Sequence, residues 1–428
     1  MIIKKLVVSN FRSIDQAEIN FSPLTLIVGA NASGKSNLIN VFRFIKDIII
    51  EGVDNAVALQ GGTAYLSNVR APKGKPISIR FDLDLSDENS FRHYSMRVKK
   101  YALSVKAIDY HFTLQPHKKG HGYRIAEDYL SITYNTYAID FTAQDSTRYQ
   151  PLDNNYFVEF HRKKSNGSCQ MRTNVDSITL PDLQSILKHD YTPPLFLQLA
   201  NEDKNELMLN RIAILYPPVF SDGSFIRLFD FDPKELKKPS SMASTKTLTE
   251  NGSNIASVLH ELLRKKENKE QLTTLLKQYL PYFNGLSVES NIDQSFSYKI
   301  EEQFSKRNFY ASFLSDGTVS ILALIIALYF EEKSKIIILE EPERNIHPKL
   351  LGFLLESAED VSKGKQVIIT THNPEFLKHA KLEYVRLVSR NEEGNSVISE
   401  PANSVSVKAF LENNLGIDDL FLQNMLEG

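Results

Sequence analysis

The segment GANASGKSN, from Gly29 to Asn37, constrains the fold of this chain more than any other feature. It fits the pattern G-x-x-x-x-G-K-[ST], and it stands between a short apolar run, Leu24 to Val28, and a stretch from Lys35 to about Ile49 with apolar residues at helical spacing. A strand, a glycine loop and a helix in this order gather backbone N–H groups and the positive end of a helix dipole around one point. We therefore expect a phosphate-binding loop within an α/β fold.

Each part of this loop has a predicted role toward a nucleoside triphosphate. Lys35 would place a positive charge near the outer phosphates, and Ser36 would offer its hydroxyl to Mg²⁺. A glycine turn with a surface lysine is the alternative, but the flanking strand and helix favour the nucleotide loop. The predicted nucleotide contacts here are Gly29, Ala30, Asn31, Ala32, Ser33, Gly34, Lys35, Ser36 and Asn37.

Two adjacent glutamates end a second apolar run in the segment ILEEPERNIHP, from Ile338 to Pro348. A carboxylate at the end of a buried strand is costly unless a cation or a chemical task compensates. A phosphate loop needs a carboxylate from another strand to help hold Mg²⁺. We expect Glu340 to bind Mg²⁺ and Glu341 to act as general base on the attacking water. The alternative is an acidic turn that faces solvent.

Two further segments carry groups that suit a γ-phosphate. Ser315, Asp316 and Gly317 precede a long apolar helix, where such a cap presents a hydroxyl, free amides and a helix dipole. His372 stands just past the predicted strand 366–370 and can hydrogen-bond a phosphate. Taken alone, the first is an ordinary helix cap and the second a structural histidine. Their order in the chain, loop, capped helix, paired glutamates and histidine, favours a shared site.

That order resembles the ATP-binding-cassette (ABC) class of ATPases. GANASGKSN resembles its Walker A motif, LSDGT its signature, ILEEPERNIHP its Walker B motif and D-loop, and TTHNPEFL its switch histidine. The segment VSNFRSI resembles the N-terminal nucleotide-contacting segment of the RecF, SMC and OLD branch, which implies contacts from Arg12 and Ser13. The closest resemblance is to bacterial AAA-type ATPases of the OLD and abortive-infection kind, which share the EEPE…HP wording.

The resemblance implies ATP and Mg²⁺ as cofactors, with Lys35, Glu341 and His372 as catalytic residues. It also implies a head-to-tail homodimer, or a higher homo-oligomer, in which each ATP lies between residues 29–36 of one subunit and residues 315–317 of the other. This sequence departs from the pattern at Asp316, where transporters have glycine, and at Glu340, where aspartate is commoner. Gln60 is the candidate for the Q-loop glutamine.

The predicted fold class is α/β: an ABC-type P-loop ATPase head with a mixed, largely parallel sheet and an inserted antiparallel β and helical subdomain. We expect an N-terminal lobe of the head in residues 1–76, which carries the Walker A motif. The inserted subdomain is expected in residues 77–250, where short alternating segments are separated by polar turns. A C-terminal lobe in residues 251–428 would carry a helical segment, the signature, the Walker B motif and the switch histidine.

Composition limits the cellular setting. The formal net charge is −2, so a nucleic-acid surface would have to be a local patch. Cys169 is the only cysteine, which excludes an intrachain disulfide. No apolar stretch has the length that spans a bilayer, and the N-terminus lacks a signal-peptide pattern. We expect a cytoplasmic protein that does not contact membranes.

Several kinds of ATPase could carry these motifs. The long interval between Ser36 and Ser315 argues against a transporter subunit. The lack of long heptad repeats argues against a chromosomal SMC protein. The few residues after His372 argue against a fused OLD nuclease. The resemblance implies a sensor or switch in bacterial phage defence or a toxin–antitoxin system, controlling a separately encoded effector such as a nuclease or toxin. A RecF-like DNA-repair ATPase that binds DNA directly is the alternative.

A basic segment from Arg92 to Arg124 bears on that choice. Basic residues interleaved with aromatic ones can bind phosphates and stack bases. On alternating strands, the same pattern would instead place the basic side chains on a solvent face and the aromatic ones in the core. A surface that binds a protein partner is a third interpretation. The basic residues are Arg92, Arg97, Lys99, Lys100, Lys106, Lys118, Lys119 and Arg124; the aromatic residues are Tyr94, Tyr101, Tyr110, Phe112 and Tyr123.

Overall fold

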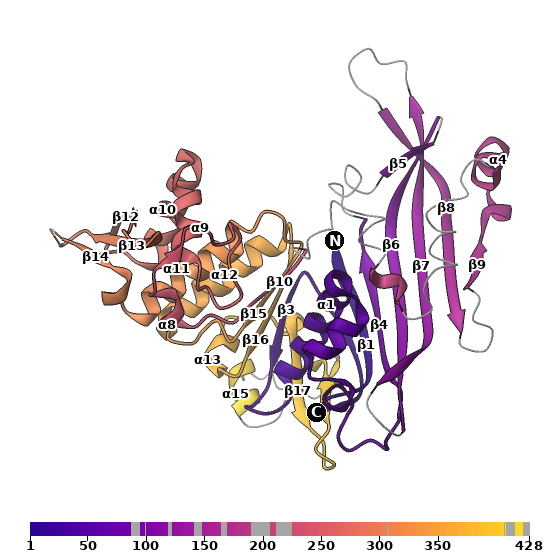
Figure 1. Ribbon diagram of the computed structural model, residues 1–428, viewed down its shortest axis with the longest axis horizontal. Helices are drawn as coiled ribbons and strands as arrows, with labels where there is room; N and C mark the ends of the chain where they lie inside the picture. The colour runs from indigo at the N-terminus through magenta and orange to yellow at the C-terminus, as the bar shows by residue number, and fades with distance from the viewer. Residues whose placement is uncertain are drawn as a thin grey trace. The chain divides into compact units, whose positions relative to one another are not determined.

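The computed structural model describes residues 1–86, 95–98, 100–118, 122–140, 148–163, 169–189, 206–210, 225–305, 307–405, 407 and 416–422. The chain forms two compact units, each built from separate stretches of sequence (Figure 1). The antiparallel unit comprises Met1–Ser22, Ser36–Phe225 and Arg390–Ile398. The parallel unit comprises Pro23–Lys35, Ile226–Ser389 and Ser399–Gly428.

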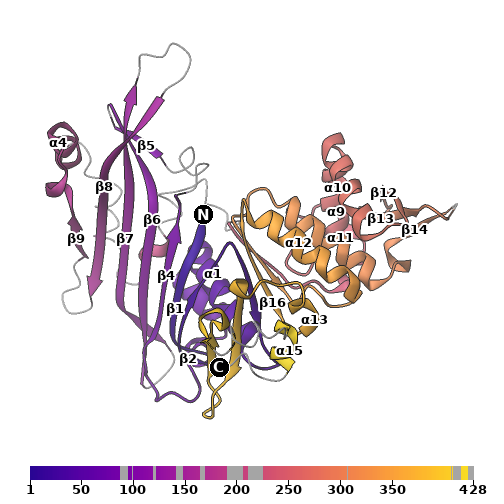
Figure 2. The same ribbon diagram turned by 180° about the vertical axis from the view of Figure 1, so that it is seen from behind.

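An eight-stranded sheet dominates the antiparallel unit, and its long strands β6, β7 and β8 run side by side in both views (Figures 1 and 2). The path is β2-β1-β4-β6-β7-β8-β9, with β5 paired to β6 and every pairing antiparallel. The strands are β1 (Ile2–Phe11), β2 (Ile14–Asn20), β4 (Ile77–Asp84), β5 (Ser95–Val98), β6 (Tyr101–Pro116), β7 (Tyr123–Asp140), β8 (Arg148–Lys163) and β9 (Cys169–Thr173). The predicted antiparallel texture is thus present.

Helix α1 (Lys35–Leu59) packs aromatic side chains against this sheet. The Phe44 ring lies 5.9 Å from that of Phe11 and 6.3 Å from that of Phe112, centroid to centroid. The apolar positions that predicted the helix are buried, and the helix runs beyond the expected end near Ile49 with a break at Gly52, whose φ is 80°. Three short elements complete the helical part of this unit: α2 (Thr63–Leu66), η1 (Val175–Ser177) and α4 (Pro181–His189).

A parallel sheet forms the centre of the other unit. Its strands β10 (Ile226–Phe229), β15 (Ile336–Glu340), β16 (Gln366–Thr371), β3 (Leu24–Val28) and β17 (Val385–Arg390) are neighbours in that order, and all four pairings are parallel. β3, β15 and β16 are almost fully buried runs of Val, Ile and Leu, as expected of strands covered on both faces. The prediction of a largely parallel sheet is confirmed for this unit.

The helix α11 (Asp316–Tyr329) lies in the core of the parallel unit, among α10 (Lys266–Tyr279) and α12 (Leu351–Ser362) (Figure 1). Every residue from Thr318 to Leu328 is buried, which is the pattern of a helix surrounded on all sides. A small antiparallel sheet of β11 (Ser240–Ser241), β12 (Phe283–Ser290), β13 (Ser295–Glu302) and β14 (Asn308–Tyr310) flanks these helices. The remaining elements are α8 (Pro233–Leu236), α9 (Ile255–Leu263), η2 (Ala311–Phe313), η3 (Pro348–Leu350), α13 (Pro374–Leu377), η4 (Leu382–Tyr384), β18 (Ser396–Ser399), η5 (Pro401–Asn403) and α15 (Ile417–Leu422).

One predicted element differs. The sequence indicated a single helical segment from about Asn254 to Tyr282, but two helices, α9 and α10, are present. Lys265 between them has extended backbone angles, φ −93° and ψ 120°, which end the first helix and start the second. Among the described residues, no helix combines the length and the apolar character needed to cross a membrane. The three-part division at residues 76 and 250 remains a prediction.

Candidate nucleotide site

The predicted site residues of the parallel unit follow strands that end at the same edge of its sheet. Glu340 at the end of β15 is in register with Thr370 on β16, and Thr371 is in register with Val28 on β3. The glycine loop follows Val28 directly, and His372 follows Thr371. Since ligands of open α/β sheets bind outside the carboxyl ends of the strands, this edge is the expected place for a nucleotide.

The loop after β3 leaves no room for side chains where it turns. A Cβ on Gly29 would lie 2.2 Å from the carbonyl oxygen of Val388, so only glycine fits there. Ala32 and Gly34 have φ values of 63° and 117°, which curl the backbone. Ala30, Asn31 and Ala32 are exposed, so this part of the loop is open to a ligand.

Lys35 is folded back onto the loop. Its Nζ donates hydrogen bonds to the carbonyl oxygens of Gly29, at 2.8 Å, and Ala30, at 3.0 Å, and its side chain is only 5% exposed. Burial lowers the pKa of Lys35, while the carboxylates of Glu341 and Glu343 act in the opposite direction. A buried ammonium held by carbonyl oxygens is a cation whose present partners a phosphate could replace.

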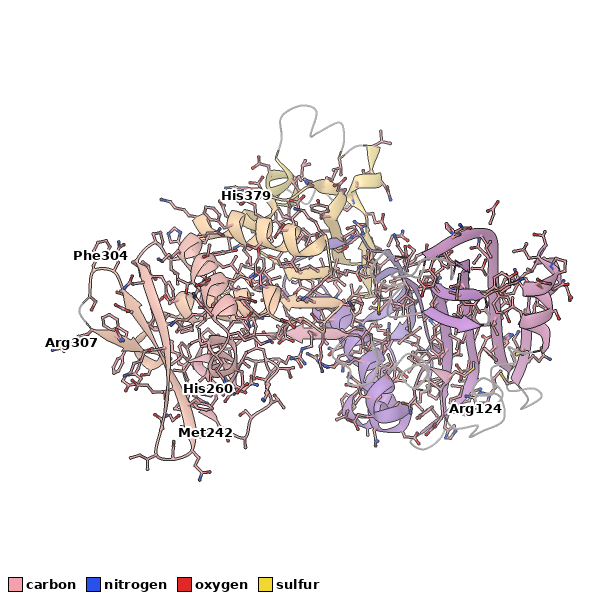
Figure 3. The ribbon with its side chains drawn as sticks, turned by 90° about the horizontal axis from the view of Figure 1, so that it is seen from above. Arg124, Met242, His260, Phe304, Arg307 and His379 are labelled. Carbon is pink, nitrogen blue, oxygen red and sulfur yellow. The ribbon has the colours of Figure 1, made fainter. Side chains whose placement is uncertain are left out.

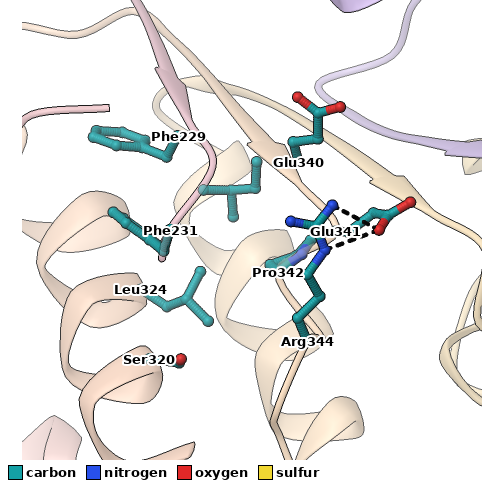
Figure 4. A pocket seen from close by; sticks show the side chains of 9 residues that line it. Phe229, Phe231, Ser320, Leu324, Glu340, Glu341, Pro342 and Arg344 are labelled. Atoms are coloured by element: carbon teal, nitrogen blue, oxygen red, sulfur yellow. Dashed lines mark hydrogen bonds and ion pairs between the residues drawn. The ribbon is translucent and has the colours of Figure 1, made fainter. Parts of the chain in front are cut away.

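Glu341 is the centre of the site, because its carboxylate lies close to three side chains that can donate hydrogen bonds, His372, Lys35 and Arg344. Oε1 lies 3.0 Å from Nδ1 of His372 and 3.8 Å from Nζ of Lys35. Oε2 accepts from Nε of Arg344 at 2.9 Å and lies 2.9 Å from its Nη2 (Figure 4). Arg344 is held in turn by Asp230, at 2.9 Å from its Nη1.

The backbone and protonation of Glu341 are both unusual. Its φ is 44°, a left-handed conformation that is strained for a side chain of this size and that clusters at functional sites. Partial burial by itself raises the pKa of Glu341, but hydrogen bonding and charge from Arg344 and His372 outweigh it, so the pKa is lowered. Glu341 is therefore a carboxylate at neutral pH, which is the form a base requires.

Glu340 points away from the Glu341–Arg344 pair, as Figure 4 shows. Its side chain is half-buried at the end of β15. Ser36, the other predicted Mg²⁺ ligand, is exposed in the first turn of α1. A hydroxyl and a carboxylate are hard oxygen ligands that suit Mg²⁺.

The N-terminal segment is tied to the start of α1 within the antiparallel unit. Ser13 Oγ accepts from the side-chain amide of Asn37 at 2.7 Å and lies 2.8 Å from Oγ of Ser396. Arg12, with φ 50°, donates to the side-chain oxygen of Gln60 at 2.6 Å. Burial and the charge of Arg43 lower the pKa of Arg12. The predicted Q-loop candidate and the predicted nucleotide-contacting arginine are therefore in direct contact.

The predicted signature residues form a helix cap beside an open cavity. Ser315 caps α11, accepting from the backbone N–H of Thr318 at 3.1 Å. A Cβ on Gly317 would lie 2.7 Å from the carbonyl oxygen of Asn345, so the D-loop packs against the cap. Asp316 pairs with Lys237 at 2.5 Å. The cavity has a volume of about 490 Å³, within the range of small-molecule sites.

Four residues that sequence reasoning missed make contacts at or next to the predicted site: Arg344, Asp230, Glu343 and Thr371. Arg344 and Glu343 lie inside the segment 338–348 that contains Glu340 and Glu341, so their charges in that segment could have identified them as candidates. Asp230 follows β10 and is far from the motifs in sequence, so only the sheet order brings it to Arg344. Burial raises the pKa of Glu343, although a hydrogen bond from Thr371 opposes the rise.

The predicted base-stacking residues of the basic segment form part of the core instead. Tyr101, Tyr110 and Phe112 are at most 7% exposed, which agrees with the core reading of these three aromatic residues and not with base stacking. Lys100 is ion-paired with Asp182 at 2.6 Å. Arg124 is exposed (Figure 3). Arg92, Tyr94, Lys99 and Lys119 lie outside the described residues, as does the side chain of Arg97.

Comparisons with known proteins agree with this architecture. The family described as "AAA domain, putative AbiEii toxin, Type IV TA system" matches residues 24–378. An SMC head bound to the C-terminal winged-helix domain of ScpA superposes with a TM-score of 0.50 at 14% identity, covering 93% of this chain and 97% of that chain. An Smc head domain with an extended coiled coil, bound to the C-terminal domain of ScpA derived from Pyrococcus furiosus, gives a TM-score of 0.50 at 12% identity, covering 96% and 98%. No curated protein matches. These likenesses confirm the predicted α/β ATPase-head fold.

Proposed function

We propose that this chain, which belongs to the AAA-domain family described as putative AbiEii toxin of Type IV TA systems, binds ATP with Mg²⁺ and hydrolyses it at the carboxyl edge of its parallel sheet. The observation that carries the proposal is the Glu341 carboxylate, held by His372, Lys35 and Arg344 at the end of a strand next to an open glycine loop. A strained, half-enclosed carboxylate beside a lysine and an arginine is a group arranged for chemistry.

The loop fits a triphosphate because Gly29 lets it pack closely against the Val388 carbonyl, while the exposed residues 30–32 leave backbone groups accessible. Lys35 would exchange its two carbonyl partners for phosphate oxygens, which are stronger partners because they carry charge. Ser36 and Glu340 would hold Mg²⁺, which neutralises charge on the transferring phosphoryl group. Arg12 and Ser13 are proposed to contact the nucleotide from the N-terminal segment.

In the proposed reaction, Glu341 orients the attacking water and accepts its proton. His372 faces the same carboxylate oxygen, Oε1, so that it can hydrogen-bond the γ-phosphate while Glu341 holds the water. Arg344 engages the other oxygen, Oε2, so the water would approach Oε1, which faces His372 and Lys35. Because Arg344 holds one carboxylate oxygen and the water would bind the other, the base is kept in one orientation.

We propose that Ser315–Gly317 act on the ATP of a second copy of this chain, in a head-to-tail homodimer. The cap of α11 presents a hydroxyl and a helix N-terminus beside the 490 Å³ cavity, which is open to a group brought by another molecule. ATP would then favour the closed dimer and hydrolysis would release it, because the contacts to the γ-phosphate exist only in the closed state.

Mixing two inactive variants tests both the chemistry and the dimer. Lys35→Ala removes the phosphate lysine, and Ser315→Arg blocks the cap without touching the loop. Each alone is expected to lose ATP hydrolysis, while Ser315→Arg still binds ATP. Mixed in equal amounts, they form dimers with one site that carries neither change, and activity returns. The trans arrangement is wrong if cross-linking shows mixed dimers and no hydrolysis returns.

We propose that the hydrolysis cycle serves as a sensor or switch in a phage-defence or toxin–antitoxin system, with a separately encoded nuclease or toxin as effector. The family description supports this setting. Direct DNA binding, as in a RecF-like repair ATPase, is distinguished by measuring hydrolysis with and without duplex DNA at two salt concentrations. Stimulation that falls steeply with salt would favour DNA and direct attention to Lys118 and Arg124.

A further inference from the structure

Glu343 is a buried carboxylate in the middle of the D-loop that the proposed chemistry does not use. It is 6% exposed, and its Oε2 has no hydrogen-bond partner in the part of the chain that the structure describes. Burying a carboxylate is costly, and native proteins keep such groups where they hold other groups in place or serve a function. Its one side-chain partner is informative.

That partner is Thr371, the last residue of β16, whose hydroxyl donates to Oε1 of Glu343. The same hydroxyl accepts a hydrogen bond from the backbone N–H of Asn373 at 3.0 Å. Thr371 and Asn373 flank His372 in the chain. The Glu343–Thr371 contact therefore sets the backbone on both sides of the histidine.

The link also fixes the base. The backbone N–H of Glu341 donates to the carbonyl oxygen of Thr370 at 3.0 Å, so the start of the D-loop is already attached to β16. Glu343 adds a second attachment two residues later, and between the two stands Glu341 with its strained φ of 44°. Two anchors on one strand hold the intervening residue in a conformation it would not adopt alone.

We infer that Glu343 is a positioning residue for ATP hydrolysis: through the Thr371 hydroxyl it locks the D-loop to the histidine loop, so that Glu341 and His372 face the same water and phosphate. This inference rests on the proposed ATPase function. Glu343 does not touch the nucleotide or exchange a proton in this scheme. Its contribution is the relative placement of two loops, where a shift on the order of 1 Å costs about a hundredfold in rate.

Pairs of near-isosteric substitutions test the link. Glu343→Leu and Thr371→Val each remove it with little change in volume. Each should lower kcat for ATP about ten- to a hundredfold. In Thr371→Val, which leaves every charge in place, KM should be nearly unchanged, because only the transition-state geometry is affected. Thr371→Ser keeps the hydroxyl and should restore most of the turnover lost in Thr371→Val. The double variant should be no slower than Thr371→Val alone, because that change already removes the Glu343–Thr371 contact.

Glu331 provides the matched control, since it is also a 6% exposed glutamate of the parallel unit. It accepts from the backbone N–H of Leu248 at 3.0 Å and lies 3.5 Å from Nε of Arg227, without contact to the site. Glu331→Gln should lower thermal stability while folded protein keeps its turnover. Wild-type kcat in folded Glu343→Leu and Thr371→Val, or losses confined to KM, would overturn the inference.

A second readout does not depend on hydrolysis. In nucleotide-free full-length protein, the backbone amide of Asn373 should exchange with deuterium faster in Glu343→Leu and Thr371→Val than in wild type, measured by mass spectrometry of peptides across residues 366–377. Unchanged exchange would contradict the loop link even if the protein proved not to hydrolyse ATP. Conversely, an inactive wild type with the predicted exchange pattern would contradict the proposed function and leave the link in place.

Discussion

Asp128 in the antiparallel unit and Glu341 in the parallel unit are both carboxylates bound by an arginine, Arg162 in one case and Arg344 in the other. Asp128 is fully buried within the long strand β7. Glu341 stands just past the end of β15 and its side chain is 14% exposed. The two groups have similar chemistry and very different surroundings.

The partners differ in kind. Asp128 accepts from the hydroxyl of Tyr110 at 2.6 Å, from Arg162 at 2.8 Å and from the backbone N–H of Met208 at 2.9 Å, so its oxygens are saturated by groups of its own unit. Burial raises the pKa of Asp128 against the pull of Tyr110 and Arg162. Glu341 has charged side chains around it, a strained backbone and an open loop beside it. Saturation and regular backbone mark a structural carboxylate; partial exposure and strain mark one placed for chemistry.

The substitution with the largest expected effect, Glu341→Gln, tests whether Glu341 is placed for chemistry. Glu341→Gln keeps the size of the side chain and one acceptor oxygen but removes the charge and the base. Hydrolysis should fall on the order of a hundred- to ten-thousandfold while ATP binding persists. Steady-state phosphate release and equilibrium binding of a labelled ATP measure the two quantities. Wild-type turnover in Glu341→Gln would show that Glu341 is not the general base and that it does not differ from Asp128 in this respect.

Asp128→Ala tests the structural half. It leaves the Arg162 guanidinium and the Tyr110 hydroxyl without their buried partner, which should lower the free energy of unfolding by about 3–5 kcal/mol. Denaturant titration followed by circular dichroism measures the change. Folded protein should keep its ATP turnover, so a specific loss of turnover at unchanged stability would contradict the structural assignment.

Arg344→Ala sharpens the account of Glu341. Because Arg344 helps to lower the pKa of Glu341, wild-type activity should persist as pH falls until the pH drops below the usual glutamate range, about 4.3. The ionised Glu341 likewise adds stability above its unfolded pKa, and this is lost as pH falls through the lowered folded value. In Arg344→Ala the acid limb of the pH–rate profile should move upward and kcat fall about tenfold, as the base loses its anchor. An unmoved acid limb would assign that limb to another group.

The smallest effect concerns a glycine of the parallel unit away from the site. Gly364 has no positive φ, and a Cβ there would meet nothing within 4 Å, in contrast to Gly29. Gly364→Ala should raise the free energy of unfolding by about 0.4–1 kcal/mol, because the unfolded chain loses freedom. Thermal melts of Gly364→Ala and Gly29→Ala compare a position where a Cβ has room with one where it would clash with the Val388 carbonyl. Equal loss of stability in both would show that steric room does not separate them.

The parts of the fold and site that follow short-range rules could be predicted from the sequence. The strand–loop–helix around Gly29 to Ser36 and the cap at Ser315 depend on neighbouring residues only, and the parallel sheet follows from alternating strands and helices. The apolar run before Glu340 likewise placed it at a strand end.

The contacts between distant segments could not be predicted. Asp230 meets Arg344 only because β10 lies next to β15, and a sequence does not state strand order. The Glu343–Thr371 link depends on the same kind of long-range placement. The sequence left open whether Tyr110 and Phe112 lie in a core or on a binding face, because alternation fits both equally well until the sheet's packing partner, α1, is known.

The pairing of β3 with β16 and β17 has a consequence for how this protein is made. β3 is among the first strands to leave the ribosome, yet Leu24 pairs with Val367 and Leu26 with Val385. At roughly 5–20 residues per second, the first strand waits for tens of seconds before its neighbours exist. During that time the glycine loop that follows β3 lacks the neighbouring strands of its sheet. Nascent chains should therefore be unable to bind ATP until β16 and β17 have been synthesised, which ties nucleotide binding to the presence of these two strands.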